Sequence, residues 1–360
     1  MKTTTLSSLE EVSCCRAVVE YHAPVNSRGG EELHPGDILD DRFLITEVIS
    51  RSGMAMIFKA QDMRHDHANV AIKVPHLACE SDPGSFARFR REEEIGLKLD
   101  HPFILKFIPV DGPRSRPYLV TEYLRGSTLA HLLDAMHPLP EKDALKIASL
   151  LCEAVQYLHD EGVIHRDLKP QNVMIGCDGT IRLLDFGLAV GADTRRVTFP
   201  GLTPAMGTPD YMAPEQVKGK RGDERTDIYS LGAILYEMLT GMTPFEGDHP
   251  LAAMNARLLG DPVAPRKLNP LLSPQAEEIV LRALEREPTR RYPSAVAMQA
   301  HLDLPDQVSV TGRAERAHSP APWRVWLRQY RTVALALVVP VIVPVAVAVY
   351  LLLRGHWSAS

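Results

Sequence analysis

The sequence predicts an α+β protein in which a strand-rich first part precedes a larger helical part and one C-terminal transmembrane helix. Short apolar runs rich in β-branched residues, such as 43–49 and 70–72, predict strands in the first third of the chain. Residues 140–160 and 227–241 carry apolar residues at helical spacing. Residues 332–353 contain no charge and match the length of about 20 residues that crosses a bilayer as a helix.

Composition describes a globular protein without a basic bias. Apolar residues make up 45% of the chain and the formal net charge is -5, so we expect no nucleic-acid partner. The five cysteines show no metal-ligand or disulfide-framework spacing, which indicates a reducing compartment. Among them, Cys14 and Cys15 form either an acylation or redox site or an incidental pair in a loose tail. Nothing at the N-terminus resembles a signal peptide.

The first 35 residues lack sustained periodicity, so residues 1–35 are predicted to be a flexible leader. Pro35-Gly36-Asp37 opens the domain, and the strand over 43–49 follows it. The segment 49–60 then reads as a strand, a turn and a strand.

Two polar clusters follow short apolar runs between Val163 and Gly187, which places each cluster on a loop at the end of a buried strand. The first cluster holds the carboxylate of Asp167, the ammonium of Lys169 and the carboxamide of Asn172, and the second holds the carboxylate of Asp185. Phosphoryl transfer needs such a set. One carboxylate orients the attacking hydroxyl, a cation offsets phosphate charge, and the remaining oxygens hold Mg²⁺.

In this order, the two clusters resemble the catalytic loop and the Asp-Phe-Gly motif of the protein kinases. With Lys169 in it, the catalytic loop is similar to that of the Ser/Thr kinases. The resemblance covers roughly residues 37–301. It implies the two-lobed protein kinase fold, with a small β-rich N-lobe over about 36–122 and a larger helical C-lobe over about 123–302. It further implies ATP and Mg²⁺ as cofactors, Asp167 and Lys169 as catalytic residues, and Asn172 and Asp185 as metal ligands.

The segment Val-Ala-Ile-Lys that ends at Lys73 matches the family's strand lysine. The residues around Lys73 are apolar, so its ammonium group is expected to be partly buried and to need an anionic partner. We expect this partner on the predicted helix 86–99. Three consecutive glutamates compete for this role, and Glu92 falls where the family places its pairing glutamate. Gly96 within this helix costs about 1 kcal/mol relative to Ala.

The segment 49–60 lies where the family places its glycine-rich loop, but the signature glycines fall at Ser50, Ser52 and Ala55. Because a Cβ hinders close approach of the backbone to phosphates, we expect weaker ATP binding. A pseudokinase or nucleotide-binding scaffold at the membrane is therefore the alternative, although such proteins usually lose a catalytic lysine or aspartate that this chain keeps. The cofactor-binding residues implied here are Ile49, Ser50, Ser52, Gly53, Ala55 and Ile57.

The segment 117–126 is a buried strand that runs into a loop, and it resembles the hinge between kinase lobes. The resemblance implies that backbone groups of Glu122 and Leu124 hydrogen-bond the adenine edge. The helix 140–160 leads into the catalytic loop and is scaffold.

Three further residues have structural roles by resemblance. Asp227 heads the helix 227–241 and holds the catalytic-loop backbone, with simple N-capping as the other interpretation. Glu215 of the Ala-Pro-Glu motif is expected to pair with Arg291.

The Thr/Gly/Pro-rich stretch after Asp185 resembles an activation segment. In the family, an arginine such as Arg166 pairs with a phosphate on this segment. We expect autophosphorylation at Thr203, with Thr198 as runner-up, and assign Thr208 a structural contact. That these threonines are solvated loop residues stays an open alternative.

The chain ends with a linker over 303–331, the predicted span over 332–353 and a short tail over 354–360. Aromatic residues flank the span, as in an interfacial belt. Five arginines lie between residue 310 and the span, and one arginine follows the span. Because positively charged residues favour the cytoplasmic side, we expect the kinase domain in the cytoplasm. The protein is then expected to cross the cell (inner) membrane once. Proteins with Ser/Thr acceptors are the expected partners, with a homodimer as the means of trans-autophosphorylation. A membrane-tethered small-molecule kinase is the other rival, although the activation segment suits a polypeptide substrate.

Overall fold

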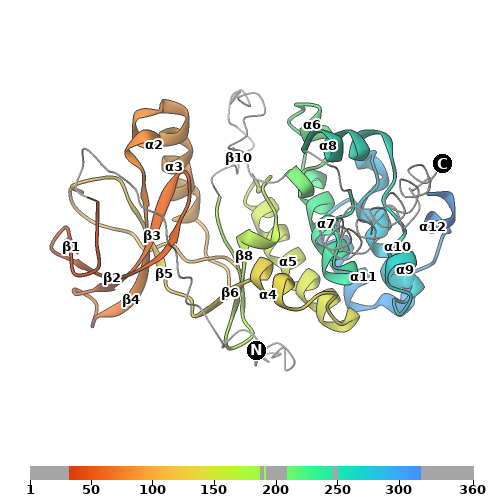
Figure 1. Ribbon diagram of the computed structural model, residues 1–360, viewed down its shortest axis with the longest axis horizontal. Coiled ribbons are helices and arrows are strands. Elements are labelled where there is room, and N and C mark those ends of the chain that lie inside the picture. Colours follow the sequence, from red (N-terminus) through yellow and green to blue (C-terminus); the bar gives the residue numbers. More distant parts are fainter. Residues whose placement is uncertain (1–31, 187–189, 192–208, 246–249, 318–360) are drawn as a thin grey trace, which may run out of the picture.

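The computed structural model describes residues 32–186, 190–191, 209–245 and 250–317, and these form two lobes joined by one chain segment (Figure 1). Each lobe has its own cluster of buried apolar residues. Within these ranges, no helix is both long and apolar enough to cross a membrane. The predicted span 332–353 lies outside them.

The N-lobe is built on a five-stranded sheet in which each strand pairs antiparallel with the next along the chain. Alternation of apolar residues buries one face, where Phe43, Phe58, Ile72 and Tyr118 pack together. The strands are β1 (Ile38–Leu39), β2 (Phe43–Arg51), β3 (Ala55–Asp62), β4 (Ala68–Pro75) and β5 (Leu119–Glu122).

Two helices, α2 (Leu77–Ser81) and α3 (Pro83–Gly96), follow β4 and lie beside the sheet (Figure 1). The sequence predicted one helix over 86–99. The structure begins α3 earlier because Asp82 caps it, with its side chain accepting a hydrogen bond from the backbone N–H of Ser85 at 2.8 Å. Pro83 occupies the first helical turn, where it is well tolerated.

The C-lobe packs helices around α7 (Arg225–Thr240), which is buried along nearly its whole length. Gly241 ends α7 with φ of 72°, a left-handed conformation that favours glycine. α5 (Glu141–Asp160) lies against α7 and leads toward the catalytic loop, as the apolar pattern predicted. The other helices are α4 (Leu129–Ala135), α6 (Pro214–Val217), α8 (Pro250–Leu259), α9 (Pro265–Leu268), α10 (Pro274–Ala283), α11 (Ala295–Asp303) and α12 (Arg313–Arg316).

Short strands and 3-10 turns between β5 and α6 carry the polar clusters. A three-stranded sheet has the order β6-β8-β9, and β7 pairs with β10. These elements are β6 (Gly126–Thr128), β7 (Val163–Ile164), η1 (Pro170–Asn172), β8 (Val173–Gly176), β9 (Ile181–Leu183), β10 (Val190–Gly191) and η2 (Pro209–Tyr211), with η3 (Pro288–Arg290) and η4 (Pro305–Gln307) farther on.

The chain beyond α11 stays on the C-lobe up to Ala317. Val308 is buried in the C-lobe core. The hydroxyl of Thr311 donates a 2.6 Å hydrogen bond to Glu278 of α10, and Arg313 forms an ion pair with the same carboxylate. The first part of the segment that the sequence marks as a linker therefore packs against the kinase domain.

Candidate active site

Asp227 organises the loop that follows β7. Its carboxylate accepts hydrogen bonds from the backbone N–H groups of His165 at 2.9 Å and Arg166 at 2.8 Å, and His159 lies 2.8 Å away. The N-cap of α7 is Glu224, so Asp227 serves the loop rather than capping its own helix. Burial would raise the pKa of Asp227, but hydrogen bonds from His159 and from the loop hold the pKa of this carboxyl below its usual value.

Three polar side chains converge on the turn after Arg166. The ammonium of Lys169 donates to Asp167 Oδ2 at 2.7 Å. The amide of Asn172 donates to the backbone oxygen of Asp167 at 2.8 Å and reaches Oδ2 at 3.3 Å. With its NH₂ group turned to Asp167, Asn172 can offer only its side-chain oxygen to a metal.

Lys73 on β4 connects the N-lobe helix α3 to the second polar cluster. Its ammonium lies 2.7 Å from Glu92 and 3.6 Å from Asp185. The structure thus selects Glu92 from the three candidate glutamates. Asp185 has φ of 59°, a strained backbone conformation, two residues after the last residue of β9.

Burial sets the electrostatics of this pair. Burial raises the pKa of Glu92 to about 7, while the ammonium of Lys73 opposes the shift and the carboxylate of Asp185 adds to it. Burial would lower the pKa of Lys73, but Glu92 and Asp185 raise it above its ordinary value, so the lysine stays charged. A permanent cation beside two carboxylates is suited to receive phosphate oxygens.

Aromatic rings connect α3 to the catalytic loop through Phe186. The ring of Phe186 lies 6.1 Å from that of Phe107 and 5.7 Å from that of His165, between centroids. Gly96 is the last residue of α3, and a Cβ built there would lie 2.5 Å from the Phe107 ring. The sequence interpreted Gly96 as a weak point within the helix, whereas its lack of a side chain makes room for this ring.

The segment in place of a glycine-rich loop forms the turn between β2 and β3. Ser50 lies on β2 opposite Ile57 of β3, and Ala55 begins β3 opposite Pro75. Ile49 is exposed, and a Cβ added to Gly53 would meet no atom within 4 Å. Ser52, Gly53 and Ala55 are the small residues of this turn, which lies next to the end of β4 that carries Lys73.

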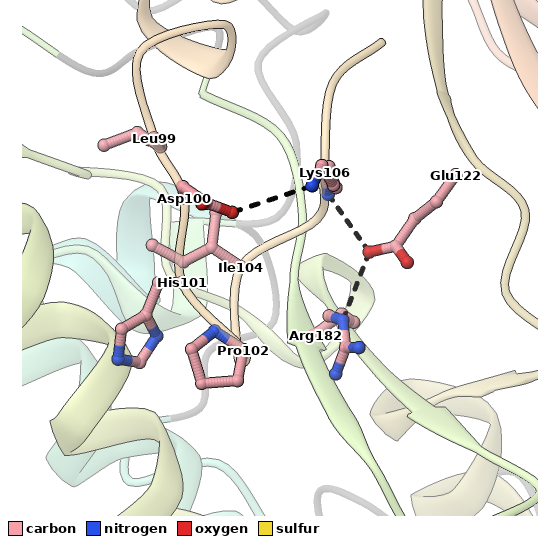
Figure 2. A pocket seen from close by; sticks show the side chains of 8 residues that line it. All are labelled: Leu99, Asp100, His101, Pro102, Ile104, Lys106, Glu122 and Arg182. Carbon is pink, nitrogen blue, oxygen red and sulfur yellow. Dashed lines mark hydrogen bonds and ion pairs between the residues drawn. The ribbon is translucent and has the colours of Figure 1, made fainter.

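Glu122 ends β5, and Figure 2 shows its carboxylate between Lys106 and Arg182. The carboxylate accepts hydrogen bonds from the backbone N–H of Lys106 at 3.1 Å and from Arg182 Nε at 3.2 Å, beside a cavity of about 250 Å³. Because the N–H of Glu122 donates to Lys106, Glu122 could meet an adenine only through its carbonyl oxygen. Leu124 follows on the connection to the C-lobe.

A buried ion pair fixes the segment after the activation loop. Arg291 forms two hydrogen bonds with Glu215, at 2.7 and 2.8 Å, and Thr226 donates to the same carboxylate at 3.0 Å. Burial would raise the pKa of Glu215, but Arg291 holds it below its usual value. The pairing of Glu215 with Arg291 that the sequence predicts is therefore present.

Arg166 is the residue that the sequence links to a phosphate on the activation segment. It is buried, and its Nε has no hydrogen-bond partner among the described residues. Burial and the nearby Arg221 lower its pKa. The expected phosphosites Thr203 and Thr198, and the structural Thr208, lie outside the described residues.

The donor set fits a magnesium ion bound together with nucleotide phosphates. Asp185 and the oxygen of Asn172 are hard oxygen ligands, the kind that Mg²⁺ prefers. Among the described residues, no group of three or more His, Cys, Asp or Glu side chains could hold a metal alone. Mg²⁺ commonly takes one or two protein ligands and completes its shell with phosphates and water, so the two are sufficient.

Sequence reasoning missed the roles of His159 and Arg182. His159 lies on the buried side of α5, and its partner Asp227 is 68 residues away. A histidine among the apolar residues of the predicted helix 140–160 was the available signal, since a buried imidazole needs a polar partner. No local pattern connects Arg182 with Glu122.

Comparison with known proteins agrees with this geometry. The family model for the protein kinase domain matches residues 46–302. The serine/threonine-protein kinase PknB of Mycolicibacterium smegmatis is 36% identical over 290 residues, which are 77% of this chain and 46% of that protein. PknB of Mycobacterium leprae is 36% identical over 269 residues, covering 73% of this chain and 43% of the relative.

A probable serine/threonine-protein kinase of Streptomyces coelicolor is 37% identical over 270 residues, covering 74% of this chain and 40% of that protein. The chain thus spans less than half the length of these relatives. The matched region contains both polar clusters, the Lys73–Glu92 pair and the two-lobed fold, which confirms the kinase fold expected from the sequence. The chain belongs to the protein kinase domain family.

Proposed function

We propose that this chain is an ATP-dependent serine/threonine protein kinase that acts at a membrane. One observation carries the proposal: Lys73 contacts both Glu92 and Asp185, at 2.7 and 3.6 Å, so the N-lobe cation is held above the C-lobe carboxylate. The relatives named as serine/threonine-protein kinases support the acceptor class. The contacts at Lys73 also argue against a scaffold that has lost its catalytic set.

The residues of the site have separable tasks. Asp167 lies in the catalytic loop, where its carboxylate can orient a hydroxyl and accept its proton. Lys169 and Lys73 offset charge on the moving phosphoryl group, and Glu92 positions Lys73. MgATP would supply the phosphoryl group when bound, and Asp185 and the side-chain oxygen of Asn172 would hold the metal that offsets phosphate charge.

We further propose switching by autophosphorylation at Thr203, with Thr198 as the second site. The buried guanidinium of Arg166 supports a phosphate partner, because a phosphate supplies charge and acceptor oxygens to such a group. Mass spectrometry of active kinase should find phosphate at Thr203, and Thr203→Ala should lower activity. Full activity with both threonines unmodified would mean that this segment does not switch the enzyme.

Membrane attachment is proposed from the uncharged segment 332–353, with the kinase domain on the cytoplasmic side of a cell membrane. Attachment would concentrate copies in a plane, which favours a transient homodimer for transfer between copies. The substrates are proposed to be proteins with accessible Ser or Thr hydroxyls.

The decisive experiment is Asp167→Asn in the full chain, with labelled ATP and a generic basic protein. Transfer should fall by more than about 100-fold, the usual contribution of a positioned acid or base, while ATP binding is retained. Asp160→Asn is the matched control, because Asp160 is an exposed carboxylate at the end of α5. Undiminished transfer by Asp167→Asn would refute the assigned mechanism.

A further inference from the structure

Two hydrogen bonds connect the phosphate-loop turn, defined here as Ser52–Ala55, to the residue after β4. The ring atom Nε2 of His76 lies 2.8 Å from the backbone oxygen of Ser52, and the backbone N–H of His76 donates to the oxygen of Met54 at 2.9 Å. A carbonyl oxygen can only accept, so Nε2 must carry the proton in this contact. One residue thus holds both sides of the turn.

The same turn is closed from within by a serine that replaces a glycine. The hydroxyl of Ser52 donates to the backbone oxygen of Ala55 at 2.9 Å and accepts from the N–H of Ala55 at 3.1 Å. The N–H of Ser52 donates to the same oxygen at 2.9 Å. These bonds fix the backbone dihedrals of a turn that glycines would leave free to move.

His76 is well placed to transmit this anchoring to the catalytic lysine. The pairing of β3 with β4 ends at Ala55 opposite Pro75, so His76 extends the ladder by one more contact. Lys73 lies three residues earlier, on β4 itself. His76 is also the N-cap residue of α2, yet its side chain forms no cap bond and serves the turn instead.

We propose that His76 is a positioning residue for ATP, because it holds the phosphate-loop turn in register with Lys73. The inference rests on the proposed binding of ATP at this site and adds a role that no kinase motif in the sequence assigns. A turn that is already ordered loses less conformational freedom when phosphates bind. Anchoring by His76 and Ser52 therefore compensates for the absent glycines. This differs from the expectation from the sequence alone, in which the missing glycines at positions 50, 52 and 55 together weaken ATP binding.

The test measures ATP and adenosine binding to the full chain by calorimetry, together with KM for ATP and kcat. Loss of one hydrogen bond corresponds to a change of about three- to tenfold, so His76→Ala should raise the Kd and KM for ATP by that factor. Adenosine lacks phosphates, so its affinity should stay unchanged, as should kcat at saturating ATP. His76→Gln can donate from its amide nitrogen and should restore ATP affinity.

Ser52→Gly should also weaken ATP binding without changing adenosine binding. His34→Ala is the matched control, because the side chain of His34 is 65% exposed and its Nδ1 lies 4.0 Å from the carboxylate of Asp37. The inference is overturned if His76→Ala leaves ATP affinity unchanged or weakens ATP and adenosine equally, or if Ser52→Gly tightens ATP. A wild-type chain that binds ATP but transfers no phosphate would refute the kinase activity and leave this role of His76 standing. A chain that does not bind ATP would refute both.

Discussion

Replacing Arg313 by alanine should destabilise the kinase domain although Arg313 lies beyond the matched kinase region. Arg313 pairs with Glu278 and Glu285, and only 5% of the Glu278 side chain is exposed. Burial would raise the pKa of Glu278, but the hydroxyl of Thr311 and the guanidinium of Arg313 hold it below its usual value. The carboxylate is therefore ionised, and its partners come from the C-terminal extension.

The magnitude follows from the burial of the two side chains. Removing one partner of a buried ion pair costs about 3–5 kcal/mol, whereas an exposed pair contributes about 0–1 kcal/mol. Arg313 is 20% exposed, and Thr311 would remain as a donor, so the expected loss lies between these limits, at about 2 kcal/mol. For a domain of this size, that corresponds to a Tm lower by about 5 °C.

Thermal unfolding of the full chain, followed by fluorescence, measures this shift. Arg316→Ala is the matched control, because Arg316 is exposed and its described bond is to the backbone oxygen of Thr311. Combining Arg313→Ala with Glu278→Gln should be less damaging than the sum of the single changes, because the two residues interact. If the Arg313→Ala protein has the same Tm as the Arg316→Ala protein, the reasoning is refuted.

Three further outcomes are expected. Asp62→Asn should lower the free energy of unfolding at pH 7 by about 2 kcal/mol, because the hydrogen bond from Arg42 holds the pKa of Asp62 at about 2, below the ordinary carboxyl value. In the wild type, this contribution to stability is therefore present above pH 4 and is lost as the pH falls toward 2. Unfolding measured as a function of acid pH would show this loss. The ATP affinity of the wild type should fall as the pH drops below about 7, because Glu92 then takes up a proton and no longer holds Lys73 in an ion pair. A Glu92→Gln chain should bind ATP weakly, and its affinity, measured by calorimetry, should depend less on pH. Full-length protein should pellet with membranes and resist carbonate extraction, whereas a chain ending at Ala317 should be soluble and keep the extension; recovery of the full chain without detergent would argue against the span.

Local sequence patterns were sufficient for most elements of the fold and for the central residues of the site. Alternating and helical apolar spacing marks strands and helices, because each must bury one face. The helix boundary at Asp82 was also readable, since Asp followed by Pro is a start signal. The motif order placed Lys73, Asp167 and Asp185, whose contacts the structure then shows.

What the sequence could not predict are pairings between distant positions on the chain. His76 meets Ser52 only because β3 and β4 pair in one register, and a histidine at the end of a strand carries no signal of its own. Arg313 meets Glu278 only because the chain turns back along α10. In the sequence, Arg313 stands at the start of a stretch rich in Pro, Ala, Arg and Ser, a composition typical of a linker. Such contacts depend on the tertiary fold.

The room that Gly96 leaves for Phe107 has a consequence for how this kinase can change during evolution. A methyl group at position 96 would overlap the ring of Phe107, which lies beside the ring of Phe186, the residue after Asp185. Substitution of Gly96 alone should thus be lost by selection, while a smaller side chain at position 107 would permit it. Among relatives, the two positions should therefore change together, with glycine accompanying an aromatic ring and alanine accompanying a smaller aliphatic residue.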